Sequence, residues 1–370
     1  MKVLVVNWRD IYNPEAGGAE IHIDEILKRK PSSWNVDFIS ALFKNATPYD
    51  QTPFYKIHRI HDNAFFNYKF RFYYKKYLLL KKYDLIIDDI SKIPLAIPSY
   101  VKDIPVISVI HHIHGNSLFK ELPYPLALYV SRMEKFLLRY YINEPIIAVS
   151  ESTKNELLCL YPYKNITVSN NGIDYDCLSS CFIKDSQKPP VLLYLGRLKK
   201  YKRIDHIIHA FAIVKNKIKN AKLLIAGKGD DEERLRSITA GLGLDQSVNF
   251  LGFIDDKDKN PVFSRSKIFV IASEKEGWGI SVLEANAAGL PAIGYDVEGL
   301  RDSIKDGYSG FLVKNSDIGL FAAKILQVLS DSGLASKLSL QANSWAKGYS
   351  WDSMAENFYR IIRDKHGLLF

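Results

Sequence analysis

The chain has 370 residues, of which 47% are apolar and 12% aromatic, and its formal net charge is +9. This length exceeds what one ordinary hydrophobic core supports, so we expect two domains, and the composition excludes a disordered chain. The positive charge indicates an anionic partner, which composition leaves open between a nucleotide diphosphate, a membrane surface and a nucleic acid.

Neither the apolar runs nor the cysteines indicate export. No apolar run reaches the roughly 18 to 20 residues that span a bilayer. The apolar start at residues 1–6 meets polar Asn7 too soon for a signal peptide and predicts a first buried strand. Cys159, Cys177 and Cys181 are an odd number without metal-ligand spacing, which predicts free, mostly packed thiols. We therefore expect a cytoplasmic protein.

A glycine pair follows the first predicted strand, residues 2–7. Gly17 and Gly18 precede a helix that we expect to run from Ala19 to about Lys30. Free backbone amides at the start of such a helix, together with its dipole, favour an anion at the loop. A glycine pair alone is equally typical of a simple turn.

Aromatic and basic residues crowd together in residues 63–83. A predicted apolar stripe at helical spacing consists of Phe66, Phe70, Tyr73, Tyr77 and Leu80. The opposite side of this helix carries Tyr68, Arg71, Lys75 and Lys82. Two interpretations stay open, a core helix with a solvated basic face and a helix that lies on an anionic membrane. Nucleic acid is not expected, because we see no helix-turn-helix, zinc-finger or RNA-binding signature.

Three histidines stand at the end of a predicted buried strand, residues 105–110. His111, His112 and His114 raise the question of a metal site. Successive side chains of an extended segment point in opposite directions, and no carboxylate or cysteine stands nearby at ligand spacing. We therefore expect no metal there.

A polar segment with two prolines, residues 184–190, is the predicted linker between the domains. We accordingly expect an N-terminal domain at residues 1–183 and a C-terminal domain at residues 184–351. A final amphipathic helix begins at Trp351 and is expected to occupy about 352–370.

Two strand exits in the second domain carry cations and glycines. The strand at 191–195 leads to Arg197 and Lys202, and a guanidinium beside an ammonium can clamp a diphosphate. The strand before Gly227 and Lys228 opens a glycine turn that lacks the third glycine of a dinucleotide fingerprint. The acidic pair in residues 256–258 lies in a polar loop and is not expected to bind metal.

The most informative stretch is Glu276 to Glu284, which reads E-G-W-G-I-S-V-L-E. A predicted buried strand at 268–271 precedes it, and ligands of open α/β sheets bind at this edge of the strands. The loop and the helix start contain Gly277, Gly279, Ile280 and Ser281. Ser281 and Glu284 have the spacing of a capping box. As an alternative, Glu284 only caps its helix and Glu276 is a solvated charge.

The two glutamates, separated by seven residues and followed by A-N-A-A-G-L-P-A-I-G, resemble the signature of the retaining glycosyltransferase group 1 family. Further similar motifs are G-G-A-E at 17–20, N-G-I-D at 171–174 and G-R-L at 196–198. Arg203 and Glu298 occupy positions where the family has glycine. The resemblance covers nearly the whole chain.

This resemblance implies a GT-B fold, an α/β fold of two doubly wound Rossmann-like domains that face a central cleft. The first domain would bind the acceptor and the second the donor, and the last helix would cross back to the first. The implied reaction moves a hexosyl group from a UDP- or GDP-linked sugar to a glycan or lipid-linked acceptor, with retention and without metal or other cofactor. Polysaccharide biosynthesis is the implied process.

The resemblance also implies roles for individual residues. Arg197 and Lys202 would hold the diphosphate, and Glu276 would face the donor sugar. Glu284 would accept hydrogen bonds from the ribose hydroxyls, since a carboxylate can accept two together. His111 would lie near the donor sugar, with His112 and His114 as alternatives in register. The other expected donor contacts are Gly17, Gly18, Gly227, Lys228, Phe253, Gly277, Gly279, Ile280 and Ser281.

Three alternatives remain. A GT-B epimerase or sugar phosphorylase would show acceptor-free turnover or dependence on inorganic phosphate. A silent nucleotide-sugar-binding protein would bind the donor without consuming it, and a membrane or nucleic-acid adaptor would ignore nucleotide sugars. Residues 63–83 favour a lipid-linked or cell-surface glycan acceptor, with peripheral association at the inner face of the membrane.

Overall fold

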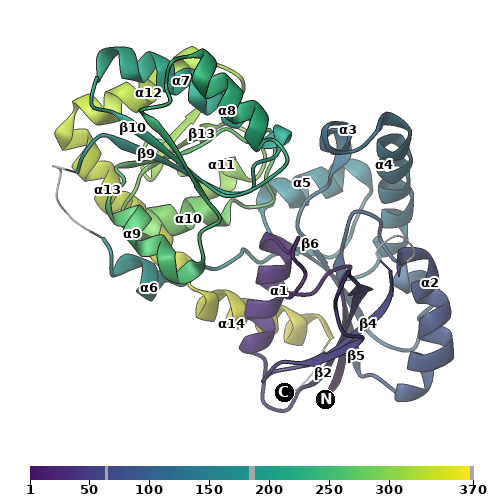
Figure 1. Cartoon of the computed structure of the whole chain (residues 1–370). Helices are drawn as coiled ribbons and strands as arrows, with labels where there is room; N and C mark the ends of the chain where they lie inside the picture. Colours follow the sequence, from purple (N-terminus) through teal and green to yellow (C-terminus); the bar gives the residue numbers. More distant parts are fainter. Residues whose placement is uncertain (63–65, 183–187, 367–370) are drawn as a thin grey trace. The chain divides into compact units, whose positions relative to one another are not determined.

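The computed structural model describes residues 1–62, 66–182 and 188–366 (Figure 1). The chain forms two units, each built on a mainly parallel sheet. Unit 1 consists of Met1–Gly172 and the C-terminal segment from Trp351, and unit 2 consists of Ile173–Ser350. Each unit alternates strands and helices in the way that a doubly wound α/β sheet requires. The predicted α/β class is confirmed.

The sheet of unit 1 has eight strands in the order β3-β4-β2-β1-β5-β6-β7-β8, and only β3 is antiparallel to its neighbour. The strands are β1 (Lys2–Val6), β2 (Asn35–Leu42), β3 (Tyr49–Gln51), β4 (Lys56–Asp62), β5 (Leu85–Ile90), β6 (Val106–Ile110), β7 (Ile146–Ala148) and β8 (Ile166–Val168). The main helices are α1 (Gly18–Lys28), α2 (Phe66–Tyr73), α3 (Leu118–Glu121), α4 (Tyr124–Leu138), α5 (Glu151–Leu160) and α14 (Trp351–His366). The strand order reverses between β1 and β5, which makes their carboxyl ends a topological switch point.

Alternate residues of β1 belong to two different cores, as expected of a strand buried on both faces. Val3 and Val5 pack with α1 and α14, whereas Leu4 and Val6 pack with α2. Helices α1 and α14 lie side by side (Figure 1), and the Tyr359 hydroxyl donates to the Ile26 carbonyl. The C-terminal helix is therefore an integral part of unit 1.

The aromatic segment is a helix whose buried face differs from the predicted stripe. Helix α2 continues as a π-helical turn at Tyr74–Leu78 and a 3₁₀ turn at Leu79–Lys81. The buried side chains are Phe66, Phe70, Tyr74 and Leu78. The predicted stripe holds for Phe66, Phe70 and Tyr73, which is partly buried against the same core. It was wrong at Tyr77 and Leu80, which are exposed, because the wider π turn brings every fourth residue to the core. Residues 63–65 of the predicted segment lie outside the described residues.

The sheet of unit 2 is fully parallel in the order β11-β10-β9-β12-β13-β14. Its strands are β9 (Val191–Leu195), β10 (Lys222–Ala226), β11 (Val248–Gly252), β12 (Ile268–Ile271), β13 (Ala292–Tyr295) and β14 (Gly310–Val313). Its helices are α6 (Tyr175–Ser179), α7 (Ile204–Lys217), α8 (Glu232–Gly241), α9 (Lys259–Ser264), α10 (Ile280–Ala287), α11 (Leu300–Ser303), α12 (Ile318–Ser330) and α13 (Ser332–Ala346). The switch point of this sheet lies between β9 and β12.

In the part of the chain that the structure describes, no single helix is long and apolar enough to cross a membrane. One pair, Ile318–Ser330 with Ser332–Tyr349, meets those criteria together but is bent by 100°.

The boundary between the units differs from the predicted one at residue 183. The chain enters unit 2 at Ile173, because α6 packs against α10 and the Tyr175 hydroxyl donates to Asn343. It returns to unit 1 after Ser350, beside the entry point, where the Ile173 amide donates to the Tyr349 carbonyl at 2.8 Å. Most of the predicted linker, residues 183–187, lies outside the described residues.

The three cysteines are free thiols, as predicted, but they are less packed than predicted. Cys159 and Cys177 are exposed and Cys181 is half-buried. Cys159 lies on α5 and Cys177 on the short α6. The sequence does not show which side of a surface helix a single cysteine occupies. The usual burial of cysteine therefore gave the wrong expectation for Cys159 and Cys177.

Candidate functional site

All the predicted donor-binding residues of the second domain lie on one edge of the unit 2 sheet. They occupy the loops and helix starts that follow the carboxyl ends of β9, β10, β11 and β12. These residues are Arg197, Lys202, Gly227, Lys228, Phe253, Glu276, Gly277, Gly279, Ile280, Ser281 and Glu284. Because the strands are parallel, segments far apart in the sequence meet there.

Two of these loops are joined through their backbones. The Leu198 amide donates to the Lys228 carbonyl at 2.9 Å, so the loop of Arg197 lies against the glycine turn after β10. A Cβ at Gly227 would overlap the carbonyl oxygen of Gly196, and Gly227 has φ +140°. Glycine is needed here because the two backbones approach too closely for a side chain.

Lys202 and Glu276 form an ion pair in the middle of this edge. The Lys202 Nζ lies 2.5 Å from Glu276 Oε1, and the two side chains are 12% and 14% exposed. Burial alone would lower the pKa of Lys202, but the adjacent Glu276 charge outweighs it and raises that pKa. Arg197 is exposed, and its guanidinium lies 3.3 Å from the Tyr201 hydroxyl. The site thus holds one fixed cation and one accessible cation beside a carboxylate.

Glu276 is held on three sides. Ser273 Oγ donates to its Oε1 at 2.6 Å, and the Glu276 amide donates to the Glu298 carbonyl at 3.1 Å. Gly299, with φ +78°, lies so close that a Cβ there would overlap the Glu276 carbonyl oxygen. Glu298, which departs from the family glycine, therefore contributes through its backbone carbonyl.

The predicted capping box at α10 is wrong. Helix α10 begins at Ile280 after Gly279, so Ser281 lies inside the first turn and no side chain caps the N-terminus. The first amides of a helix have no partner within the helix, and here they lie at the ligand edge of the sheet. Glu284 instead accepts a hydrogen bond from Lys259 Nζ at 2.6 Å.

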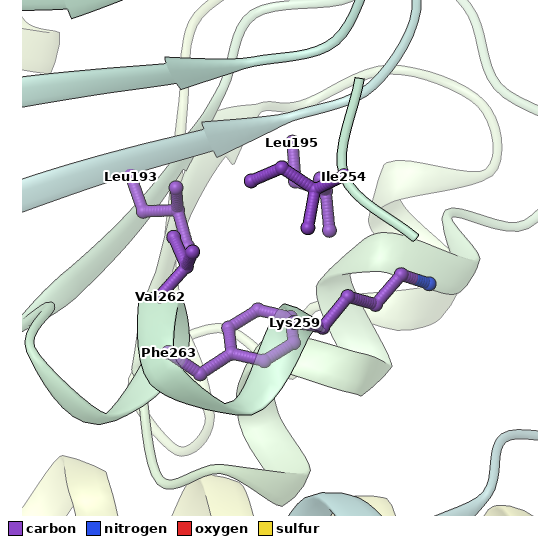
Figure 2. A pocket seen from close by; sticks show the side chains of 6 residues that line it. All are labelled: Leu193, Leu195, Ile254, Lys259, Val262 and Phe263. Carbon is purple, nitrogen blue, oxygen red and sulfur yellow. The ribbon is translucent and has the colours of Figure 1, made fainter. Parts of the chain in front are cut away.

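Lys259 was not predicted from the sequence. It opens α9 and borders a shallow apolar hollow at the end of β9 (Figure 2). The other residues that line this hollow are Leu193, Leu195, Ile254, Val262 and Phe263. Phe253, in the adjoining loop, is 67% exposed. A lysine within the polar run 255–259 gives no signal that separates it from its solvated neighbours, so only the fold identifies it.

Arg203, the other residue that replaces a glycine of the family, has a structural role. It adopts a left-handed conformation with φ +49° and ψ 42°, which costs a non-glycine residue about 1 kcal/mol. Its guanidinium lies 2.6 Å from Glu274 Oε1 and also contacts His206. The ion pair of Arg203 with Glu274 joins the loop that carries Lys202 to the loop that carries Glu276.

Replacing Arg203 by glycine is expected to leave the protein more stable than replacing it by alanine. Both variants lose the Glu274 ion pair, but only glycine relieves the left-handed strain, so we expect a difference of about 1 kcal/mol, or about 2 to 4 °C in the unfolding midpoint. Thermal unfolding measures it. The matched control is Lys200, in the adjacent 3₁₀ turn, where alanine should be the more stable replacement. Equal midpoints for the two Arg203 variants would contradict this account.

In unit 1 the predicted His111 lies at the switch point of the sheet. Its Nε2 is 2.8 Å from Asp89 Oδ1, and Asn7 donates to the other Asp89 oxygen at 2.5 Å. Burial lowers the pKa of His111, but the charge of Asp89 outweighs it and raises the pKa above its ordinary value. Since a carboxylate only accepts, Nε2 carries a proton and the ring orientation is fixed.

The other two histidines have different surroundings. Glu134 of α4, which is buried, accepts hydrogen bonds from the His114 and Gly115 amides and lies 2.9 Å from His114 Nδ1. The His112 ring packs on the His114 ring with centroids 4.2 Å apart. His114 therefore anchors the loop, and of the three alternatives only His111 is oriented by a carboxylate at the switch point. In the described ranges 1–62, 66–182 and 188–366, no three His, Cys, Asp or Glu side chains are grouped to hold a metal.

The predicted glycine pair opens α1 and leads to a second buried histidine. Gly18 begins the helix, and the Gly17 amide donates to Glu20 Oε2 at 2.7 Å. One turn later, the fully buried His22 ring meets His111 edge-on at 5.3 Å and lies 6.2 Å from the Trp351 ring. Burial, and then the charge of His111, hold the pKa of His22 well below its usual range. His22 is thus a neutral spacer between α14 and His111.

Comparison with known families matches both units. Residues 182–345 match the family described as glycosyl transferases group 1, and residues 16–176 match glycosyltransferase family 4. The chain belongs to the group 1 glycosyltransferase family. The resemblance that rested on the E-x₇-E motif is confirmed.

Several glycosyltransferases of known sequence are similar to the chain. An uncharacterized glycosyltransferase of Methanocaldococcus jannaschii is 32% identical over 246 residues, which are 61% of this chain and 62% of that protein. The capsular polysaccharide biosynthesis glycosyltransferase CapM of Staphylococcus aureus is 27% identical over 253 residues, 64% of this chain and 66% of that protein. In both cases the matched part spans less than two thirds of the relative.

Solved structures of this fold extend over almost the whole chain. A sucrose-phosphate synthase from Thermosynechococcus elongatus superposes with a TM-score of 0.79 at 20% identity and covers 98% of both chains. HepE from Anabaena, in complex with UDP and glucose, superposes with a TM-score of 0.76 at 18% identity over 98% of this chain and 100% of that one. These glycosyltransferase structures show the GT-B fold.

Proposed function

We propose that the protein moves a hexosyl group from a UDP- or GDP-linked sugar to a glycan or lipid-linked acceptor, with retention at the anomeric carbon and without a metal ion. The observation that carries this proposal is the Lys202–Glu276 ion pair beside Arg197, at the ligand edge of the unit 2 sheet. The complex of HepE with UDP and glucose, on the same fold, supports a nucleotide-sugar donor.

In this proposal the cations stabilise the leaving group. The bond between the anomeric carbon and the phosphate oxygen breaks, and the released diphosphate gains negative charge. The exposed Arg197 would contact the diphosphate, and Lys202 would add a second positive charge where the α10 dipole also favours an anion. Such fixed charges would stabilise the leaving diphosphate in the way that a divalent metal does in other phosphoryl-sugar enzymes.

Glu276 is assigned to sugar binding rather than to a covalent intermediate. Its Oε1 already accepts from Lys202 and Ser273, so the carboxylate is tied in place and suited to accept from a sugar hydroxyl. The acceptor hydroxyl would attack the face that the diphosphate leaves, and its proton would pass to the departing phosphate oxygen. His111, oriented by Asp89, would donate a hydrogen bond to a sugar hydroxyl.

The test is turnover with UDP- and GDP-hexoses and a panel of glycan and lipid-linked acceptors, in the presence of a chelator. We expect acceptor-dependent release of the nucleoside diphosphate and, by NMR, an α-linked product from an α-linked donor. A requirement for inorganic phosphate would indicate a phosphorylase instead, and turnover without acceptor would indicate an epimerase. Donor binding without any turnover would indicate a binding protein.

We also propose that residues 66–82 attach the protein to an anionic membrane. In this segment, which we call the aromatic–basic surface, Phe72 is 74% and Leu80 is 86% exposed. The other exposed members are Tyr68, Lys69, Arg71, Lys75, Lys76, Tyr77, Leu79, Lys81 and Lys82. Exposed aromatic and aliphatic side chains among lysines are typical of interfacial helices, and each basic residue contributes about 1 kcal/mol near an anionic surface.

The double variant Phe72→Ser/Leu80→Ser is expected to bind vesicles of phosphatidylglycerol and phosphatidylcholine at least tenfold more weakly than the wild type, because it loses the apolar anchors. Vesicle co-sedimentation at low and high salt measures this. The matched control is Leu340→Ser, since Leu340 is 49% exposed on α13 of unit 2. Equal binding of both variants, or binding to pure phosphatidylcholine, would contradict the proposal.

A further inference from the structure

Lys259 makes two ion pairs of different character. Its Nζ lies 2.6 Å from Glu284 Oε1 and 2.7 Å from Asp256 Oδ1. The side chains of Lys259 and Glu284 are each 15% exposed, whereas that of Asp256 is 90% exposed. Water screens the Asp256 pair, so the contact with Glu284 is the one that fixes the lysine.

The ammonium of Lys259 has little freedom to leave this position. Its aliphatic stem borders the apolar hollow beside Leu195 and Ile254 (Figure 2), which holds the stem at a desolvated surface. Burial would lower the pKa of Lys259, but the Glu284 and Asp256 charges outweigh it and raise that pKa. The lysine therefore stays charged at neutral pH and keeps its carboxylate partner.

We propose that Lys259 is a positioning residue for the ribose of the donor: it holds Oε1 of Glu284 and leaves Oε2 to accept from the ribose hydroxyls. This inference rests on the proposed function, which assigns the ribose to Glu284. A carboxylate offers about four lone-pair sites on its two oxygens, so one ammonium leaves room for a diol. A carboxylate without this cation would be free to turn away from the sugar.

The simpler alternative is that the pair only ties α9 to α10. In that case its loss would lower stability and would weaken every nucleotide alike. A positioning role makes a different prediction: the 2′-hydroxyl should contribute less to nucleotide affinity when Lys259 no longer holds Glu284. The ratio of affinities for a ribonucleotide and its 2′-deoxy analogue separates the two.

The experiment measures dissociation constants by calorimetry for UDP and GDP and for their 2′-deoxy analogues. The variants are Lys259→Met, Glu284→Gln and the control Lys257→Met, an exposed lysine of the same loop. We expect the wild type to bind the ribonucleotide at least tenfold more tightly than the deoxy form. Lys259→Met should lose about tenfold for the ribonucleotide but less than threefold for the deoxy form, and Lys257→Met should match the wild type.

The outcomes distinguish this inference from the function it rests on. If Glu284→Gln abolishes the preference for ribose and Lys259→Met retains it, the inference is wrong and the donor site stands. If Glu284→Gln also retains the preference, or if no nucleotide binds the wild type, the ribose assignment itself is wrong. Should Lys259→Met not fold, Lys259→Gln, which keeps a polar hydrogen-bond donor without the charge, decides by the same ratio.

Discussion

Lys202→Met is expected to lower kcat/KM for the nucleotide-sugar donor by about 10²- to 10³-fold, mainly through kcat. In the proposed reaction this side chain is one of the two cations beside the leaving diphosphate, so its contribution should grow toward the transition state. It is also the ion-pair partner of Glu276 at 2.5 Å, and its loss frees the carboxylate that is assigned to the sugar. Steady-state kinetics of diphosphate release measures both effects.

Lys200→Met is the matched control for this variant. Lys200 lies in the same 3₁₀ turn but is exposed, so its replacement should change kcat/KM by less than about threefold. A circular dichroism spectrum and an unfolding midpoint close to the wild type show that Lys202→Met is folded. If Lys202→Met raises KM alone with kcat unchanged, the lysine binds the donor without assisting its departure, and the leaving-group role is wrong.

Asp88→Asn is expected to stabilise the protein, and more so at higher pH. Asp88 is buried in β5, where it accepts a hydrogen bond from the Tyr141 hydroxyl at 2.6 Å. Burial first, and then the adjacent Asp89 charge, raise its pKa from 3.8 to about 7. The folded protein therefore holds a proton that the unfolded chain releases, and ionisation of Asp88 costs up to about 4 kcal/mol of stability.

Because the folded-state pKa is the higher one, the wild type loses stability as the pH rises from about 4 to about 7, and asparagine removes this loss. The stability gap between variant and wild type should widen by roughly 3 kcal/mol between pH 5 and pH 8, which is about 6 to 12 °C in the midpoint. Asp103→Asn, at an exposed position, should show no such gap. A gap that stays constant with pH would contradict the buried ionisation.

Much of the fold could be predicted from the sequence, because short apolar runs define buried parallel strands and the loops after them carry the chemistry. The runs that became β9, β10 and β12 are each followed within five residues by a residue predicted to bind the donor. Parallel topology alone brings these residues, Arg197, Gly227 and Glu276, to one edge. The sequence also showed that Arg203 and Glu298 replace glycines of the family. Only the structure showed that Arg203 forms an ion pair with Glu274 and that Glu298 accepts a hydrogen bond through its backbone carbonyl.

The contacts that hold the site residues in place could not be predicted, because they join residues that are distant in the sequence. Asp89 orients His111 across two strands, Lys259 reaches Glu284 between two helices, and His22 meets Trp351 from the other end of the chain. None of these pairs has a periodic spacing that would identify it. The π-helical turn after Tyr73 shifted the buried face of the aromatic helix for a similar reason, since helical periodicity assumes a regular turn.

Hydrogen–deuterium exchange with saturating UDP, and separately GDP, tests the central claim that unit 2 binds a nucleotide-sugar donor. We expect one of the two nucleotides to slow exchange in residues 196–203, 227–230 and 276–284, where the loops of β9, β10 and β12 meet, while NAD leaves them unchanged. Slower exchange in these three segments together would place the donor at the ion pair of Lys202 and Glu276. No change with either nucleotide, or protection confined to other segments, would contradict the proposed glycosyl transfer at this site.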